Sequence, residues 1–259
     1  MRKPTKKTPT YHAPALEKGL DILEYLATQR APLTQIELAR ALGRGQSEIF
    51  RMLTCLERRG YIQKDPASGT YSTTLRLFEL GHTHSPYEKL LRAAGQPMRE
   101  YAAQVHESCH LGIIHKGQLL LLAQEERQER VRLSVEVGSL FPLPHAVSGR
   151  LMMAFLSETA LRDLWQYDPE IREFSEAKRA AFNKQLQQIR ARGFEEAYSE
   201  TIYGLYDLSV LIGSASSHVQ AALTASALTH DPKEARKRLL EPLRACAQTI
   251  GQAAGLLIE

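Results

Sequence analysis

Apolar residues recur every three or four positions at the start of the chain, a spacing that places them on one face of an α-helix. A first run begins at Pro14 and stops before Pro32. A second follows Thr34, which with Glu37 three residues later has the pattern of a capping box, and ends at Gly43. The pattern therefore predicts two amphipathic helices. Their expected core positions are Leu16, Leu20, Leu23 and Ala27, then Ile36, Ala39 and Leu42.

A third run predicts a helix within GRGQSEIFRMLTCLERRGYI, residues 43–62. Its apolar positions are Ile49, Met52, Leu53 and Leu56, spaced at i, i+3, i+4 and i+7. The opposite face carries Ser47, Phe50, Arg51, Thr54 and Arg58. A helix whose core face is already filled gains nothing by exposing a phenylalanine to water. Phe50 is therefore expected either to contact a ligand or to pack against the neighbouring helix.

Two short β-prone runs follow, at residues 61–64 and 70–74, joined by Asp-Pro-Ala-Ser-Gly. Turn residues between two such runs predict a β-hairpin. Three helices, a short glycine-containing turn between the second and third, and a hairpin form the layout of a winged helix-turn-helix. The sequence therefore predicts a DNA-binding unit at this end of the chain.

The rest of the chain alternates between helix-like and strand-like patterns. A helical stretch with a break near Ser85 and Pro86 leads into β-rich runs separated by turns. Further helices are expected at residues 148–156, 158–165, 176–192 and 232–257, and further strands at 207–213 and 219–227. Interleaved strands and helices of this kind predict an α/β domain with a mainly antiparallel sheet.

Charge separates the two ends of the chain. Residues 1–64 hold twelve Lys and Arg against six Asp and Glu, a balance of +6, so the remainder carries −2 of the net +4. A basic front and a near-neutral body indicate a polyanion partner for the front only. The opening MRKPTKKTPTYHAP lacks the apolar core of a secretory signal. It is interpreted as a flexible basic arm, with a tail of no role as the alternative.

Several functional classes are not indicated. No apolar run approaches the ~20 residues that a membrane span needs, so a cytoplasmic protein with no membrane partner is expected. Three widely spaced cysteines fit neither a disulfide framework nor a zinc cluster. His106 and His110 have helical i, i+4 spacing, with His115 beyond, but the sequence turns β-like between them and no further ligand completes a set. No metal and no cofactor are predicted.

Five segments, in order, are similar to those of the IclR family of transcriptional regulators. The family's first helix resembles ALEKGLDILEYLA, its helix-turn-helix LTQIELARALGRGQSEIFRMLTCLERRGYI, and its wing KDPASGTYSTTLRLFELG. Its later segments resemble LPHAVSGRLMMAFLS and RGFEEAYSETIYGLYDLSVLIGSASSHVQAALTASAL. Together these segments run almost the whole length of the chain.

The resemblance implies an α+β fold, with an N-terminal winged helix-turn-helix domain joined by a linker helix to a GAF-like α/β effector-binding domain. The expected boundaries are 1–12 for a basic arm, 13–84 for the DNA-binding domain, 85–104 for the linker helix and 105–259 for effector binding and oligomerisation. The implied function is a repressor or activator of catabolic genes. Its implied partners are a double-stranded DNA operator, a small organic or aromatic metabolite, and further copies of the chain in a homodimer or homotetramer.

In a helix-turn-helix the third helix enters the major groove and its N-terminal residues meet base edges. Gln46 suits adenine, Arg51 guanine or a phosphate, and Phe50 a thymine methyl group. Glu48 either accepts from cytosine or merely suits the positive end of the helix. Ser47 and Thr54 reach bases or phosphates, or are solvated. The candidate phosphate contacts, some of which are plain surface residues, are Arg44, Arg58, Arg59, Lys64 and Arg76.

The effector candidates carried over from the family by position are Val147, Ser148, Gly149, Asp207, Ser209, Thr224 and Ser226, and His145 is added because it lies just before the expected helix. A helix starting at Ser148 presents free N–H groups to an anionic or polar ligand. Thr224 and Ser226 are two apart on a strand, so they share one face, which either lines the site or is solvated. His145 either lines the site or packs in an ordinary way.

Asp207 departs from the family pattern. The corresponding position is often small, apolar or cysteine, and a following proline is common where this chain has Leu211. A buried carboxylate repels an anion but suits a hydroxyl, an amine or a protonated group. The residue therefore weakens the expectation of a simple small-acid effector.

Two other functional classes compete with a metabolite-controlled regulator. An enzyme would use the second domain for catalysis, but the sequence has no Gly-x-Ser-x-Gly, His-Glu-x-x-His, phosphate loop or Rossmann fingerprint. A DNA-binding scaffold would use the second domain only to oligomerise. Binding of a metabolite, with or without turnover, separates the three hypotheses.

Overall fold

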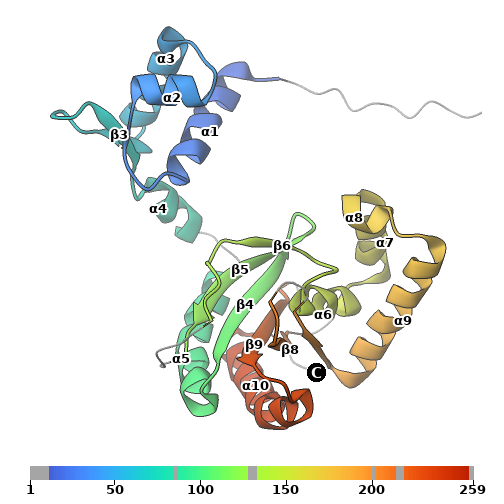
Figure 1. Cartoon of the computed structure of the whole chain (residues 1–259). Coiled ribbons are helices and arrows are strands. Elements are labelled where there is room, and N and C mark those ends of the chain that lie inside the picture. Colours follow the sequence, from blue (N-terminus) through green and yellow to red (C-terminus); the bar gives the residue numbers. More distant parts are fainter. Residues whose placement is uncertain (1–11, 84–86, 128–132, 200–201, 214–218, 257–259) are drawn as a thin grey trace, which may run out of the picture. The chain divides into compact units, whose positions relative to one another are not determined.

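The computed structural model describes residues 12–83, 87–127, 133–199, 202–213 and 219–256. The chain divides into two compact units, Met1–Ser85 and Pro86–Glu259 (Figure 1). The arm expected over residues 1–12 lies outside the described residues except for His12.

The first unit contains the predicted three helices and hairpin. Its helices are α1 (Pro14–Ala27), α2 (Gln35–Ala41), α3 (Gln46–Arg58) and α4 (Arg76–Thr83). Its antiparallel sheet has the order β1-β3-β2, with β1 at Leu33–Thr34, β2 at Ile62–Lys64 and β3 at Thr70–Thr73. The capping box is confirmed, because the Glu37 amide donates to the Thr34 hydroxyl at 3.3 Å and the Thr34 amide donates to the Glu37 carboxylate at 2.7 Å.

The buried face of α1 differs from the predicted one. Leu16 and Leu20 are 63% and 46% exposed, whereas Ile22, Leu23 and Leu26 are buried. The reason is that α1 packs against α3 and β3, and the residues that meet them come from the C-terminal half of the helix. The periodicity found the helix and the core position Leu23, but it placed the rest of the core face wrongly.

The second unit is built on a six-stranded antiparallel sheet of order β6-β5-β4-β9-β8-β7. The strands are β4 (Ser108–His115), β5 (Gln118–Glu125), β6 (Leu140–Pro142), β7 (Phe194–Tyr198), β8 (Leu205–Ile212) and β9 (Ala221–Leu228). The helices are α5 (Glu88–Val105), α6 (Val147–Phe155), α7 (Glu158–Tyr167), α8 (Pro169–Arg172), α9 (Glu176–Arg192) and α10 (Pro232–Ala254). The predicted antiparallel sheet with interleaved helices is confirmed.

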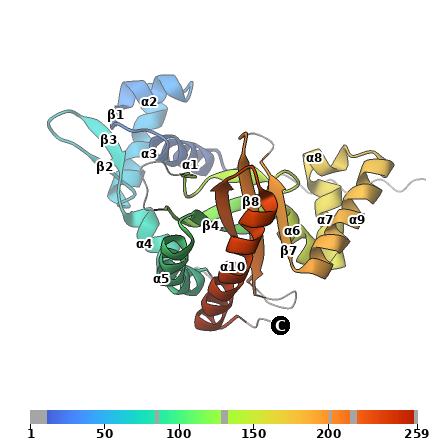
Figure 2. The ribbon, with the colours of Figure 1, turned by 60° about the horizontal axis from the view of Figure 1, so that its bottom comes forward.

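Helices cover the two faces of this sheet with different chemistry. On one face lie α5 and α10 (Figure 2), and the side chains between them and the sheet are apolar. The stretch expected as a linker at residues 85–104 corresponds largely to α5, which buries Leu90, Met98 and Tyr101 there. Over the other face lies α6, backed by α7 and α9, whose Trp165 and Phe182 meet edge to face at 5.9 Å.

The start of α6 approaches the preceding chain too closely for any side chain at Gly149. A Cβ atom there would lie 2.3 Å from the carbonyl oxygen of Leu143 and 2.8 Å from its Cα. Both atoms belong to the backbone and cannot turn aside. Gly149 therefore fixes how α6 sits against the chain that leads into it.

We expect Gly149→Ala to destabilise the second unit by about 1–3 kcal/mol, because the added methyl group forces backbone apart. Gly95 in α5 is the matched control, since a Cβ there meets nothing within 4 Å. Gly95→Ala should be neutral or stabilise by up to about 1 kcal/mol. Thermal and urea denaturation of both variants measure the difference, and equal stability of Gly149→Ala and the wild type would contradict the packing described.

Candidate functional site

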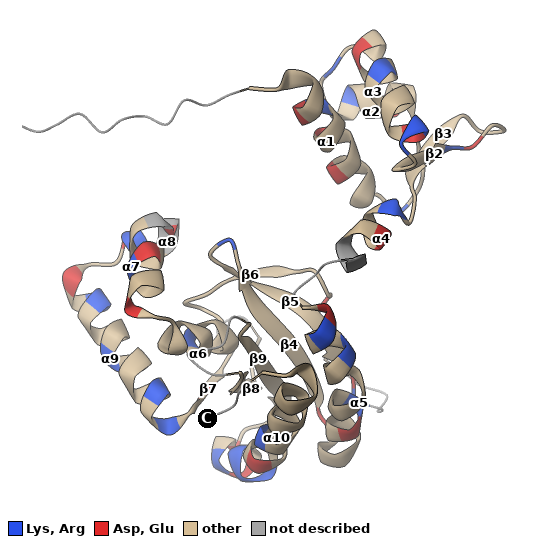
Figure 3. Cartoon of the chain, turned by 180° about the vertical axis from the view of Figure 1, so that it is seen from behind, with Lys and Arg blue, Asp and Glu red and all other residues tan. Residues whose placement is uncertain are grey.

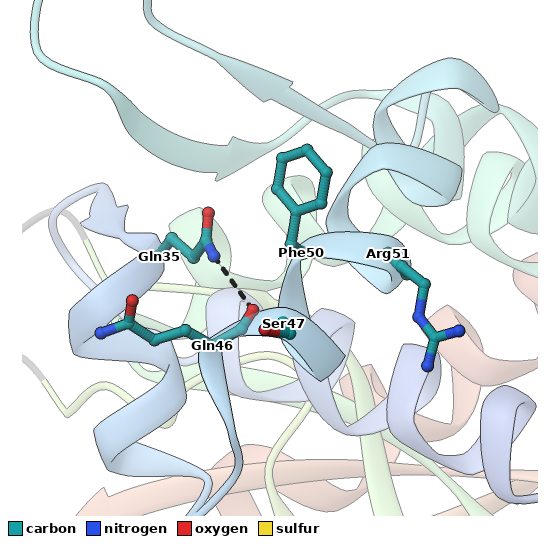
Figure 4. Close-up of a pocket in the computed structure, with 5 residues that line it drawn as sticks. All are labelled: Gln35, Gln46, Ser47, Phe50 and Arg51. Carbon is teal, nitrogen blue, oxygen red and sulfur yellow. Dashed lines mark hydrogen bonds between the residues drawn. The ribbon is translucent and has the colours of Figure 1, made fainter.

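The exposed face of α3 carries most of the predicted base contacts. Phe50 is 53% exposed, and with Gln46, Ser47, Arg51 and Gln35 of α2 it lines an open hollow of about 470 Å³ (Figure 4). The side-chain amide of Gln35 donates to the Gln46 carbonyl at 3.0 Å and so joins the starts of α2 and α3. The structure therefore gathers four predicted residues at one surface and adds Gln35, which the sequence pattern did not single out.

More than half of the Phe50 side chain is exposed, so this residue is not tucked against the neighbouring helix. Thr54 is also exposed, and its hydroxyl donates to the Phe50 carbonyl at 2.9 Å within the helix. The hydroxyl proton of Thr54 is thus already engaged, which leaves the oxygen as an acceptor only.

Two predicted DNA contacts, Arg44 and Glu48, form ion pairs with residues of α1. Glu48 pairs with Lys18 and lies 3.7 Å from Arg44, and Arg44 also pairs with Asp21. The Lys18 ammonium lowers the pKa of Glu48 by hydrogen bonding to its carboxylate. The Glu48 carboxylate thus fastens α1 to the start of α3, a structural role that neither of its two predicted interpretations included.

The remaining candidate phosphate contacts lie on the surface of the first unit, and Figure 3 marks the Lys and Arg residues along it. Arg58 and Arg59 are exposed at the C-terminal end of α3. On β2, Lys64 is exposed with its ammonium 5.5 Å from the Tyr71 ring centre. Arg76 pairs with Glu79 at 3.1 Å, so part of its charge is offset within α4.

In the second unit, strand register places polar residues side by side on the face that also packs against α6. Thr224 of β9 lies opposite both Ser209 of β8 and His110 of β4. The next pairs along bring Asp207 and Ser108 to either side of Ser226. We call this group the polar face, and its members are Ser108, His110, Asp207, Ser209, Thr224 and Ser226.

The hydroxyl groups of the polar face are buried and hydrogen-bonded. Ser226 donates to an Asp207 carboxylate oxygen at 2.6 Å, and the Ser209 and Thr224 hydroxyls lie 2.9 Å apart. Ser108 accepts from the Arg127 amide at 3.1 Å. Thr224 is 1% and Ser226 6% exposed, so the interpretation of this strand face as solvated is wrong.

Asp207 and His110 are the two members of the polar face that keep accessible surface. Burial raises the pKa of Asp207, although His110, Ser226 and Arg150 act in the opposite direction. Burial also lowers the pKa of His110, which favours the neutral imidazole. No role was predicted for His110, because only the pairing of β4 with β9 brings it beside Thr224.

A buried ion pair lies at the edge of the same face. Glu195 of β7, opposite Ser209, accepts from Arg150 of α6 at 2.9 Å and also pairs with Arg192. Arg150 donates further to the Pro144 and His145 carbonyls, at 3.1 and 3.2 Å. This cluster ties α6 and the chain before it to the sheet, and neither Arg150 nor Glu195 was among the predicted site residues.

The predicted residues at the start of α6 differ in exposure. Val147 and Ser148 are buried, and α6 packs against β8 and β9 on the side of the polar face. His145 is exposed, unlike them. Gly149 has the packing role described above, so its presence is explained without a ligand.

A second hollow, also about 470 Å³, opens between α6, α7 and α9. Leu161, Trp165 and Leu186 give it apolar walls, and Arg162 and Arg190 stand among its lining residues. It lies apart from the predicted effector residues, none of which lines it.

Within the described ranges, no three His, Cys, Asp or Glu side chains are placed to hold a metal ion. No helix in that part of the chain is long and apolar enough to cross a membrane. All three cysteines are free thiols, with Cys55 exposed and Cys109 and Cys246 buried.

Two family models together match most of the chain. The IclR helix-turn-helix domain matches residues 15–66, and the C-terminal domain of the bacterial transcriptional regulator IclR matches residues 86–252. Among curated relatives, XynR of Escherichia coli K12, an HTH-type transcriptional regulator, is 24% identical and covers 93% of this chain and 97% of its own length. The glycerol operon regulatory protein of Streptomyces coelicolor is 25% identical, with coverages of 93% and 96%.

Solved structures share the fold over nearly the whole length. An IclR homologue of Microbacterium hydrocarbonoxydans complexed with 4-hydroxybenzoate gives a TM-score of 0.77 at 20% identity, covering 93% of this chain and 99% of that one. HmgR of Pseudomonas aeruginosa gives 0.71 at 26% identity, with coverages of 92% and 100%.

Proposed function

The chain belongs to the IclR family of bacterial transcriptional regulators, and from this membership we propose that a small molecule on the polar face controls operator binding by α3. The observation that carries the proposal is the polar face itself. Six hydrogen-bonding residues gather on the inner side of a sheet whose other face is apolar. Packing alone does not require polar residues at such positions.

At the DNA end, the proposal is supported by the exposed side chains of Gln46, Ser47, Phe50 and Arg51 around one open hollow. In this arrangement Arg51 and Gln46 read base edges and Phe50 meets a thymine methyl group. Gln35 joins them from α2. Arg58, Arg59 and Lys64 contact phosphates, while Arg44 and Glu48 support the position of α3 through their pairs with α1.

At the effector end, the proposal assigns Asp207, Ser209, Thr224 and Ser226 to the ligand, with Ser148 at the start of α6. The relative crystallised with 4-hydroxybenzoate shows that this fold accommodates a small organic molecule. Control of catabolic genes is part of the proposal, and it is supported by the relative named as a glycerol operon regulatory protein. We propose a cytoplasmic homodimer or homotetramer that binds its effector without turnover.

For the DNA end we expect Arg51→Ala to relax base preference at one operator position, at a cost of about 1–3 kcal/mol for the preferred base. Lys64→Ala should weaken binding to all sequences alike and reduce the salt dependence of binding. Fluorescence anisotropy with the operator and single-base variants, at several salt concentrations, separates the two effects. An unchanged competition profile for Arg51→Ala would refute its assignment to base reading.

For the effector end, a ligand that binds only the folded protein raises the melting temperature, so a metabolite panel that includes 4-hydroxybenzoate should yield at least one hit. The same compound should change the affinity for the operator. A compound that stabilises the protein without affecting operator binding would contradict control through this site. Chemical turnover of the hit would revive the enzyme hypothesis, and a complete lack of hits would favour the scaffold.

A further inference from the structure

Two carboxylates lie on the same side of the large sheet with opposite surroundings. Glu195 is 1% exposed and is balanced by the guanidinium groups of Arg150 and Arg192. Asp207, on the neighbouring strand, receives one hydrogen bond, from Ser226. In the part of the chain that the structure describes, no cation lies within ion-pair distance of its carboxylate.

An ionised carboxylate that is removed from water is costly unless it is paired or fully hydrogen-bonded. Two carboxylate oxygens accept about four hydrogen bonds, so one bond from Ser226 leaves most of that capacity unused. Packing does not require a charge at position 207, because an asparagine side chain has the same shape and can accept the same hydrogen bond from Ser226. Asp207 is therefore costly to the folded protein in a way that Glu195 is not.

The neighbouring groups offset the cost of burying the Asp207 carboxylate only in part. Arg150 is engaged with Glu195 and with two backbone carbonyls, and Arg192 with Glu195. His110 lies on β4, on the other side of β9 from Asp207, opposite Thr224 where Asp207 is opposite Ser226. Burial lowers the pKa of His110 and so favours its neutral imidazole. A neutral imidazole both donates and accepts one hydrogen bond, so it adds a second polar group to the face on which Asp207 lies.

The accessible surface shows where a ligand would meet these groups. Ser209, Thr224 and Ser226 are buried and bonded to one another or to Asp207. Asp207 and His110 retain accessible surface on the same face. The unused acceptors of Asp207 thus belong to the part of the polar face that keeps solvent-accessible surface.

We propose that the effector presents a hydrogen-bond-donating group, a hydroxyl or an amine, to Asp207 and His110, and that it does not place a carboxylate or phosphate there. This rests on the proposed function and specifies the ligand class of that site. A hydroxyl donates to the Asp207 carboxylate and exchanges a second bond with His110, and an ammonium group supplies the missing charge. An acid group at the same place would meet like charge in a weakly solvated environment.

A matched pair of variants tests the stability side without any ligand. Glu195→Gln should lower the melting temperature by several degrees, because it leaves Arg150 and Arg192 short of their counter-charge. Asp207→Asn should leave the melting temperature unchanged or raise it, because it removes a buried carboxylate that no ion pair among the described residues balances. A fall for Asp207→Asn as large as that for Glu195→Gln would overturn the inference, since it would show a structural role for the charge.

Matched ligands test the recognition side. We would titrate the full chain with benzoate, 4-hydroxybenzoate and 4-(aminomethyl)benzoate, using the wild type and Asp207→Asn. The hydroxyl or the amine should raise wild-type affinity at least about tenfold over benzoate, and the gain should fall below about threefold in Asp207→Asn. The compound with the larger gain distinguishes a hydroxyl-bearing from an amine-bearing effector.

A gain of the same size in both proteins would overturn the inference. So would tighter binding of benzoate than of the other two compounds by the wild type. In either case, a compound that still altered operator affinity would leave the proposed function standing. The inference and the proposed function therefore fail on different measurements.

Discussion

The alternation of side chains along β4, β8 and β9 is the constraint on which the second unit depends. Successive residues of a strand point to opposite faces, so each strand divides its residues between two environments. Cys109, Leu208 and Leu223 thereby meet α5 and α10 in an apolar core. Their neighbours His110, Ser209 and Thr224 meet the side of α6. A shift of one residue in register would exchange the two sets and destroy both the core and the polar face.

This division explains why the polar face is so closely connected internally. Buried hydroxyls must find partners, and the paired strands supply them at hydrogen-bonding distance, as between Ser209 and Thr224. Glu195 pairs with Arg150 and Arg192. Arg150 also donates to the Pro144 carbonyl and so holds the chain before α6 in place. Asp207 accepts a single hydrogen bond, from Ser226, and has the most unused acceptor capacity on the polar face. It is therefore the group through which a ligand would interact most directly with this fold.

Local sequence patterns predicted the helices and strands well. The features that they did not predict depend on contacts between residues far apart in the sequence. The capping box of Thr34 and Glu37 and the long helix α9 follow from residues close together in sequence. The pairing of Glu48 with Lys18 joins residues thirty positions apart, and no periodicity contains it. Strand register places His110 on the polar face, and the packing of α6 brings Arg150 to Glu195. The core face of α1 was misplaced in part for the same reason, since contacts with α3 and β3 determine which residues are buried.

The central claim is that a small molecule bound on the polar face governs operator binding. Hydrogen–deuterium exchange of the full chain, with and without a saturating compound that alters operator affinity, tests it most directly. We expect slower amide exchange in β4, β8, β9 and the start of α6 when the compound is bound. Protection confined to α7 and α9, around the hollow near Trp165, with no change in those strands, would contradict it.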